Sequence, residues 1–289
     1  MGVHDAPQWL LSAWVHACIG AGATASHEEI ENVGARLIDR WDGPGRHFHN
    51  VRHLVDVLMR VDELAEEAHE PDLVRLAAWY HGAIFSAADV AAYAQKGGED
   101  EAASAQLARK ELIGLGIPED RADRVHHLVT ALAHHSPAPG DLDCIVLCDA
   151  DLSVLASEPQ RYKAYLEEVR QEYAHLPAED FLRARIAIMT KLCDRPTMFG
   201  SPHGANWEEA ARQNVGAELH RLVKELAEIE RTKAEAEPAA TEAAATAEAA
   251  ATAAAATEAA ATEAADDDGW PAGSPDGSPD DSSGPQPRA

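Results

Sequence analysis

Apolar residues recur three or four positions apart through most of the first 230 residues of this 289-residue chain. This spacing lines one face of an α-helix, and no run alternates in the way that marks a β-strand. The residues Val51, Leu54, Val55 and Leu58 form such a stripe. The pattern therefore predicts an all-α fold, a single bundle of about ten helices. The expected helices cover residues 7–22, 26–41, 49–68, 71–84, 99–115, 118–135, 141–156, 159–173, 178–192 and 207–231.

Local signals support several of these boundaries. Ser26 and Glu29 have the S-x-x-E spacing of a capping box at a helix start. The D-G-P-G turn at 42–45 must end the helix before it. Pro71 suits the first turn of the helix that it opens, and Gly82 suits a C-cap at that helix's end. Between the helices, residues 86–98 form a polar connection without strong periodicity.

The composition changes abruptly after residue 232. Residues 1–232 are expected to form the folded domain, and residues 233–289 form a tail that is rich first in Ala, Thr and Glu and then in Pro, Gly, Ser and Asp. Alanine favours helix, so residues 239–265 are expected to be helical in part. The last two dozen residues are expected to be disordered, which makes the tail as a whole largely disordered.

The net charge of −26 argues against a nucleic-acid or membrane partner, because an acidic surface repels phosphate backbones and anionic lipids. No segment has the features of a signal peptide or of a membrane span, so a cytoplasmic location is expected. The four cysteines include no C-x-x-C pair, which indicates a reducing compartment. Cys144 and Cys148 favour buried thiols, with a structural zinc site as the alternative.

Two groups of residues suggest a metal ion. His49 and His53 are four positions apart, so on a helix their imidazoles face the same side, about 5–6 Å apart at Cβ. Asp149 and Asp151 interrupt an apolar run, and a buried carboxylate needs a partner. Imidazole and carboxylate together suit Zn, Fe, Mn or Mg. Core or surface histidines without a metal are the alternative. Because Asp149 and Asp151 are two positions apart, at most one of them enters a given site.

The arginines offer candidates for binding an anion. Arg46 directly precedes the histidine-rich stretch, and a guanidinium can pair with phosphate through two hydrogen bonds. Arg170, Arg185 and Arg212 lie in otherwise apolar helices, where ion pairs with acidic neighbours are the simpler interpretation.

Several blocks resemble, in the same order, those of the HD superfamily of metal-dependent phosphohydrolases, and in particular its bacterial stand-alone group. They are R-H-F-H-N-V-R-H-L at 46–54, W-Y-H-G-A-I-F at 79–85, D-E-A-A-S-A at 100–105, L-V-T-A-L-A-H-H at 128–135 and C-D-A-D-L at 148–152. Later blocks at 162–173, 181–185 and 211–219 agree, so that the resemblance extends from about residue 9 to residue 226. It implies an HD-domain-like helical bundle.

The resemblance also implies roles for individual residues. His53, His81 and Asp151 would bind a divalent metal (Mn, Fe, Zn or Mg), Asp149 would be an alternative or supporting ligand, and His49 would lie beside them in the substrate pocket. Glu101 or His134 would orient or deprotonate the attacking water. The expected substrate is a small phosphorylated molecule, a nucleotide or another phosphoester.

The sequence departs from the family at one position. The residue after His81, where the superfamily has its eponymous aspartate, is Gly82. Glycine has no side chain with which to bind a metal, so one carboxylate ligand is missing. Two outcomes follow: either the remaining residues still form a hydrolase, or the chain is a catalytically degenerate protein that uses the old cavity to bind a ligand or a partner.

Overall fold

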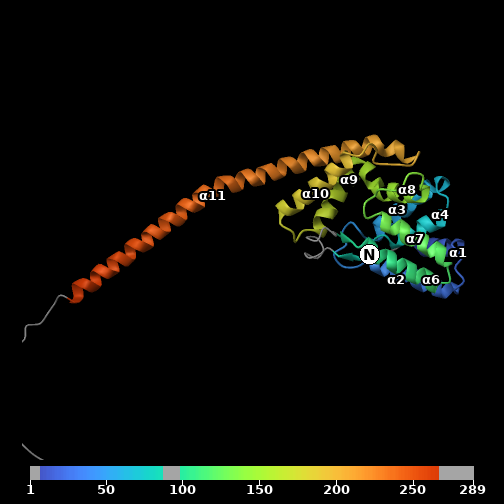
Figure 1. Ribbon diagram of the computed structural model, residues 1–289, viewed down its shortest axis with the longest axis horizontal. Helices are drawn as coiled ribbons and strands as arrows, with labels where there is room; N and C mark the ends of the chain where they lie inside the picture. Colours follow the sequence, from blue (N-terminus) through green and yellow to red (C-terminus); the bar gives the residue numbers. More distant parts are fainter. Residues whose placement is uncertain (1–6, 87–97, 267–289) are drawn as a thin grey trace, which may run out of the picture. The chain divides into compact units, whose positions relative to one another are not determined.

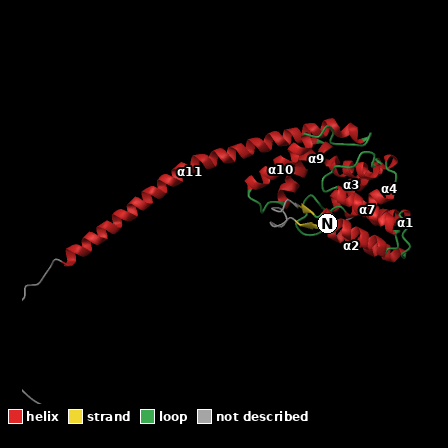
Figure 2. Cartoon of the chain, in the orientation of Figure 1, coloured by secondary structure: helices red, strands yellow, loops and turns green. Residues whose placement is uncertain are grey.

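A computed structural model describes residues 7–86 and 98–266, apart from the side chains of 237–244 and 257–266. Nearly all of its secondary structure is helical (Figures 1 and 2), which confirms the predicted all-α class. The elements are α1 (Gln8–Gly20), α2 (His27–Trp41), α3 (Val51–Glu63), η1 (Ala65–Glu67), α4 (Pro71–Tyr80), β1 (Phe85–Ser86), β2 (Gly98–Glu99), α6 (Glu101–Gly114), α7 (Glu119–Ala131), α8 (Leu142–Leu152), η2 (Ser153–Ala156), α9 (Pro159–Glu172), α10 (Ala178–Cys193), η3 (Gly204–Trp207) and α11 (Glu208–Asp266).

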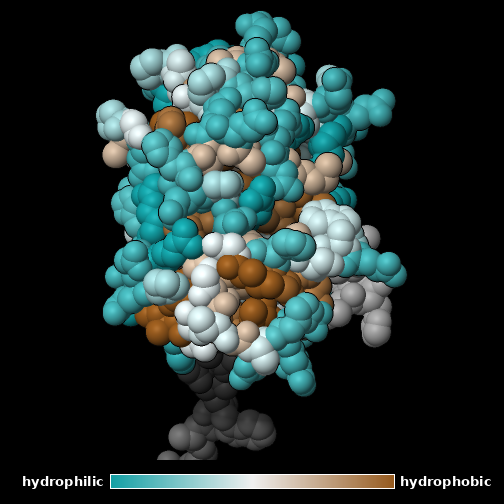
Figure 3. All heavy atoms as spheres, turned by 90° about the vertical axis from the view of Figure 1, so that its right-hand side faces the viewer, coloured by the Kyte–Doolittle hydropathy of each residue, from teal (hydrophilic) through white to brown (hydrophobic). Residues whose placement is uncertain are grey.

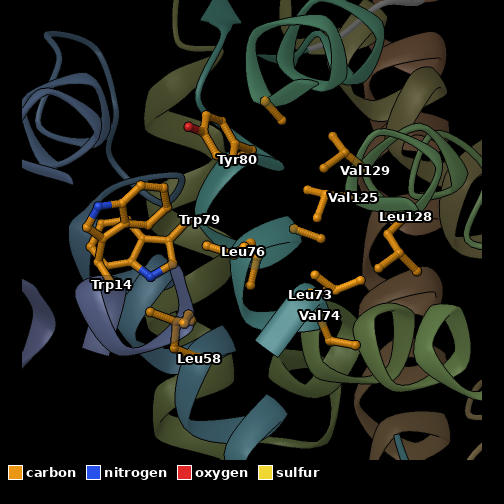
Figure 4. Close-up of a cluster of buried hydrophobic side chains, with 14 of the residues drawn as sticks. Trp14, Leu58, Leu73, Val74, Leu76, Trp79, Tyr80, Val125, Leu128 and Val129 are labelled. Carbon is orange, nitrogen blue, oxygen red and sulfur yellow. The ribbon is translucent and has the colours of Figure 1, made fainter. Parts of the chain in front are cut away.

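Helix α4 lies inside the larger hydrophobic core. Its residues Leu76 to Tyr80 are all buried. Trp79 meets Trp14 of α1 edge to face, with the ring centroids 5.3 Å apart. Val125 and Leu128 of α7 pack on the other side of the helix (Figure 4). Because α4 is enclosed by other helices, the residue that follows it, His81, is delivered into the protein interior.

A second hydrophobic core joins α9, α10 and the first part of α11. Tyr165, Met189 and Val215 are buried there, together with Phe48 from the segment before α3. The buried carboxylate of Glu218 accepts hydrogen bonds from Arg185 Nε at 2.8 Å and from the Tyr162 hydroxyl. The ion pair predicted for Arg185 is therefore present. Phe48 connects this core to the residues around His53, because the two rings lie 4.6 Å apart.

The chain divides into two compact units, Met1–Ile229 and Glu230–Ala289. Helix α11 begins in the first unit and continues to Asp266, through the alanine-rich stretch that was expected to be helical only in part. The disorder expected for the last two dozen residues concerns 267–289, which lie outside the described residues. Most of the polar connection at 86–98 also lies outside them.

Local signals explain where the helices near the site begin and end. The predicted capping box is present, since Ser26 Oγ accepts a hydrogen bond from Glu29 N while Glu29 accepts one from Ser26 N. Helix α3 begins later than predicted because the Asn50 side chain accepts a hydrogen bond from Arg52 N and so caps the helix. His49 therefore precedes α3. The strands β1 and β2, which the sequence pattern did not indicate, pair in antiparallel fashion.

The face of the first unit in Figure 3 carries mainly hydrophilic side chains around a smaller apolar patch. Among residues 7–86 and 98–266, no helix is both long enough and apolar enough to cross a membrane.

Candidate metal centre

Three side chains converge at the candidate site, two from helices and one from the residue after a third helix. His53 lies in the first turn of α3, His81 directly follows α4, and Asp151 is near the end of α8. The two imidazole Nε2 atoms are 3.2 Å apart. Asp151 Oδ1 lies 3.2 Å from His53 Nε2 and 3.7 Å from His81 Nε2. The structure thus brings together residues that are 28 to 98 positions apart in the sequence.

The second ring nitrogen of His81 fixes how this side chain faces the site. Its Nδ1 lies 2.6 Å from the carbonyl oxygen of Ala78, so the hydrogen is assigned to Nδ1 and the lone pair to Nε2. Burial lowers the pKa of His81 to about 4, so this imidazole is neutral at pH 7. A neutral imidazole whose far nitrogen donates to a carbonyl is the usual arrangement of a metal-binding histidine.

Asp151 is charged although only 11% of its side chain is exposed. Burial by itself would raise its pKa, but hydrogen bonds from His135 and His53 outweigh this effect and hold the pKa well below the usual range. The contact with His135 joins His135 Nε2 to Asp151 Oδ2 at 2.6 Å. Asp151 Oδ1 remains directed toward the two imidazoles. A negative charge thus faces the Nε2 atoms of two imidazoles, and imidazole and carboxylate together suit a divalent cation.

A second carboxylate, from Glu99 of β2, also reaches this point. Its Oε1 lies 3.9 Å from His81 Nε2. Ligand atoms of Glu99, His53 and His81 all fall within 4.8 Å of one another. Glu99 Oε1 is buried and has no hydrogen-bond partner among the described residues. Burial raises the pKa of Glu99 to about 8, with the nearby charge of Asp151 adding to the effect.

Gly82 is a glycine for steric reasons. A Cβ atom at this position would clash with the ring of Trp41 and would lie only 2.6 Å from Glu99 Oε1. Gly82 does not have the positive φ angle that would favour glycine, and the C-cap position of α4 belongs to His81. The predicted C-cap role of Gly82 is therefore wrong.

The two residues predicted to bind substrate, Arg46 and His49, both contact neighbouring segments of the chain. His49 is outside α3, and its Nδ1 lies 2.7 Å from Glu172 Oε2. Arg46 donates to the carbonyl oxygens of His49 at 2.9 Å and of Gly82 at 2.8 Å, and its guanidinium stacks on Phe85. Burial lowers the pKa of Arg46 to about 10. Arg46 thus connects the segments before α3 and after α4, and its role in binding phosphate stays a prediction.

Asp149 points away from the candidate site. Its carboxylate accepts hydrogen bonds from Gly200 N at 2.9 Å and from Ser201 N at 2.7 Å, and so anchors the turn before η3. Its proposed role as an alternative metal ligand is corrected accordingly. As expected from the two-residue spacing, only Asp151 of this pair enters the site.

Of the two adjacent histidines after α7, His135 reaches the candidate site. His134 is exposed, and its carbonyl oxygen accepts a hydrogen bond from Arg195. The choice of His134 is therefore corrected to His135, which contacts Asp151. Glu101 begins α6 and is half-buried, and this burial raises its pKa above the ordinary value.

A cavity of about 360 Å³ opens beside the convergent residues. His53 and Asp151 form part of its wall, and Phe48 lies next to them. Arg161 of α9 is also in the wall, where its guanidinium contacts Asp56 at 3.4 Å and Glu168 at 3.2 Å. The volume lies within the range of small-molecule sites, about 300–1,000 Å³.

The donor set fits a divalent metal ion. His53, His81, Asp151 and Glu99 combine two imidazoles with two carboxylates, and one buried carboxylate oxygen lacks any other described partner. Of these four residues, Glu99 was not identified from the sequence, and neither was the supporting His135. Comparison with models of protein families found no match, and comparisons with curated proteins and with solved structures found none either.

Proposed function

We propose that this chain is a divalent-cation-dependent phosphohydrolase that acts on a small phosphoester, such as a nucleotide. The observation that supports the proposal most strongly is the convergence of His53, His81 and Asp151, whose three ligand atoms are separated by 3.7 Å or less. A neutral imidazole and an ionised carboxylate in such an arrangement are ligands for Zn, Fe, Mn or Mg.

A bound divalent cation supplies positive charge that stabilises a phosphoryl transition state and lowers the pKa of water. The chain's own residues hold the site in shape. His135 fixes Asp151 through Oδ2 and leaves Oδ1 toward the imidazoles. Ala78 fixes the ring of His81 through Nδ1. Half-buried Glu101 remains the candidate to accept a proton from the attacking water.

The cavity beside His53 and Asp151 is the proposed place for the substrate. Its positive charges, Arg60 and Arg161, are each paired with acidic side chains in its vicinity. A substrate phosphate would compete with these carboxylates for the guanidinium groups. The cavity volume and the acidic surface favour a small phosphoester over a nucleic-acid chain.

The test uses the full chain, freed of metal by a chelator and then reloaded separately with Mn, Fe, Zn or Mg. We expect about one or two ions per chain for at least one metal, and hydrolysis of an aryl phosphate or of a nucleotide by the loaded protein. His53→Ala should lose both properties. His47→Ala is the matched control, because His47 lies in the same segment but is exposed.

Two results would contradict the proposal. A wild-type protein that retains almost no metal after each loading would exclude the metal centre itself. A protein that binds metal but hydrolyses none of a broad panel of phosphomonoesters, nucleotides and cyclic nucleotides would instead be a ligand-binding protein.

A further inference from the structure

We propose that Glu99 supplies, from β2, the carboxylate that position 82 lacks, and that it binds the divalent cation together with His53, His81 and Asp151. The inference rests on the proposed metal centre and assigns to it a ligand from a different segment of the chain. Gly82 then leaves room for a carboxylate from another segment of the chain.

The position of the carboxylate is the first argument. Glu99 Oε1 lies 3.9 Å from His81 Nε2, which itself lies 3.2 Å from His53 Nε2. Two ligand atoms that are each about 2.1 Å from one zinc ion are separated by at most about 4.2 Å. Both distances fall below this limit, and the third pair, Glu99 and His53, lies within 4.8 Å. A modest movement of the Glu99 side chain therefore lets a single ion contact all three residues.

The surroundings of Glu99 Oε1 are the second argument. The atom is buried, and no described residue hydrogen-bonds to it. A buried polar atom without a partner is costly, and a charged one costs more. Asp151, the other carboxylate at the site, has its Oδ2 oxygen bound by His135. Of the two, Glu99 is the carboxylate whose inward oxygen lacks a partner until a cation binds.

The third argument is steric. The space that a side chain at position 82 would enter is filled by Glu99 Oε1 and by the ring of Trp41. Residue 82 must therefore be small for the Glu99 carboxylate to reach the two imidazoles. Since Gly82 has no positive φ angle, this packing is the reason that remains for a glycine here.

Hydrogen bonds hold the backbone around Glu99 in place. Glu99 pairs with Phe85 across the strands β1 and β2. Asp100 N donates to Ile84 O at 3.0 Å, and the Asp100 side chain caps α6 through Ala103 N. A carboxylate carried by such a fixed backbone loses little freedom when it binds an ion.

The test compares Glu99→Gln with the wild-type full chain in metal-free form. Titration with Mn²⁺ or Zn²⁺ should show an affinity about 10- to 100-fold lower in the variant. The absorption spectrum of the Co²⁺-loaded protein should also change, because it reports the ligands around the ion. Glu28→Gln makes the same substitution at an exposed position on α2 and should leave both readouts unchanged.

A purely structural role for Glu99 predicts a different result. If its carboxylate were needed for packing, Glu99→Gln would lower the thermal midpoint of the metal-free protein. If Glu99 is instead an ion ligand that has no partner in the metal-free protein, Glu99→Gln should leave that thermal midpoint unchanged or raise it. The stabilisation by added metal, by contrast, should be smaller in Glu99→Gln than in the wild type.

The outcomes separate this inference from the proposed function. If His53→Ala abolishes metal binding while Glu99→Gln keeps the wild-type affinity and Co²⁺ spectrum, the metal centre stands and the role of Glu99 is refuted. If the wild-type chain binds no divalent ion, both fail together. A loss of affinity in Glu99→Gln, with the fold intact and Glu28→Gln unaffected, supports the inference.

Discussion

At the scale of single residues, Asp151 contacts both the two imidazoles of the candidate site and the supporting residue His135. One carboxylate oxygen faces the imidazoles of His53 and His81, and the other lies 2.6 Å from His135 Nε2. A partner that holds a ligand from behind fixes its orientation and tunes its charge. His135 is therefore a positioning residue that acts through Asp151.

Replacing His135 should weaken the site without removing a ligand. We expect His135→Asn to lower the affinity for Mn²⁺ or Zn²⁺ about 10-fold or more, as measured by calorimetric titration of the metal-free protein. Asparagine is chosen because His135 has a φ angle of 45°, which asparagine tolerates better than most residues. The matched variant His134→Asn should change the affinity less than twofold, because His134 is exposed. Equal effects of the two substitutions would contradict this role.

Only some of these residues could be predicted from the sequence. His53, His81 and Asp151 stand in recognisable blocks, and the two-residue spacing of Asp149 and Asp151 already excluded a shared site. Glu99 follows K-G-G in a polar segment without periodicity, and its role depends on the space beside Gly82, which no local pattern encodes. The feature that could have indicated Glu99 is the run of three acidic residues at 99–101, the first acids after Gly82 in the described part of the chain.

The choice between His134 and His135 depended on the end of one helix. The pattern predicts a helix to residue 135, but α7 ends at Ala131 and the chain turns until His135 adopts a positive φ angle. The direction of both side chains changes with that turn. The start of a helix matters in the same way for His49. The pattern predicts it on a helix face, but α3 begins only at Val51.

At the scale of elements, α8 is the helix whose position matters most, since it delivers Asp151. Its first turn is held by Arg124 of α7, which contacts both Asp141 and Asp143. Asp143 also accepts hydrogen bonds from the backbone N–H groups of His69 and Glu70, ahead of α4. This cluster connects the helices that carry His81 and Asp151.

The cluster makes a pH-dependent contribution to stability. Hydrogen bonds from Arg124 hold the pKa of Asp141 below its ordinary value of 3.8, against the opposing effect of partial burial. A carboxylate with a lowered pKa stabilises the fold fully above its unfolded value, and this stabilisation is lost as the pH falls through the lower, folded value. The expected window therefore lies below about pH 4.

Asp141→Asn tests this contribution. At pH 7 the substitution should lower the free energy of unfolding by about 1–3 kcal/mol, because it weakens hydrogen bonds between charged groups. The difference from the wild type should shrink as the pH falls below about 4, where the wild-type carboxyl is itself protonated. Urea unfolding at a series of pH values measures both effects. Asp39→Asn, at an exposed position in α2, should show neither.

At the scale of the whole chain, the last packed contacts of the first unit determine how much of α11 the fold needs. Leu222 is buried in the second core, and Leu226 and Ile229 pack against it. The second unit starts at Glu230 and continues into the alanine-rich part of α11. Of the net charge of −26, −10 belongs to residues 233–289.

Two truncations that differ by twelve residues should therefore behave very differently. A chain that ends at Ile229 should keep the thermal midpoint of the first unit and its metal affinity, because it retains every residue of the second core. A chain that ends at Ala217 also loses Glu218, and with it the buried partner of Arg185 and Tyr162. Removing one member of a buried ion pair costs about 3–5 kcal/mol, to which the lost burial of Leu222 adds. We expect the shorter chain to be largely unfolded by circular dichroism, and a shorter chain that melts like the longer one would contradict this assignment of the folded domain.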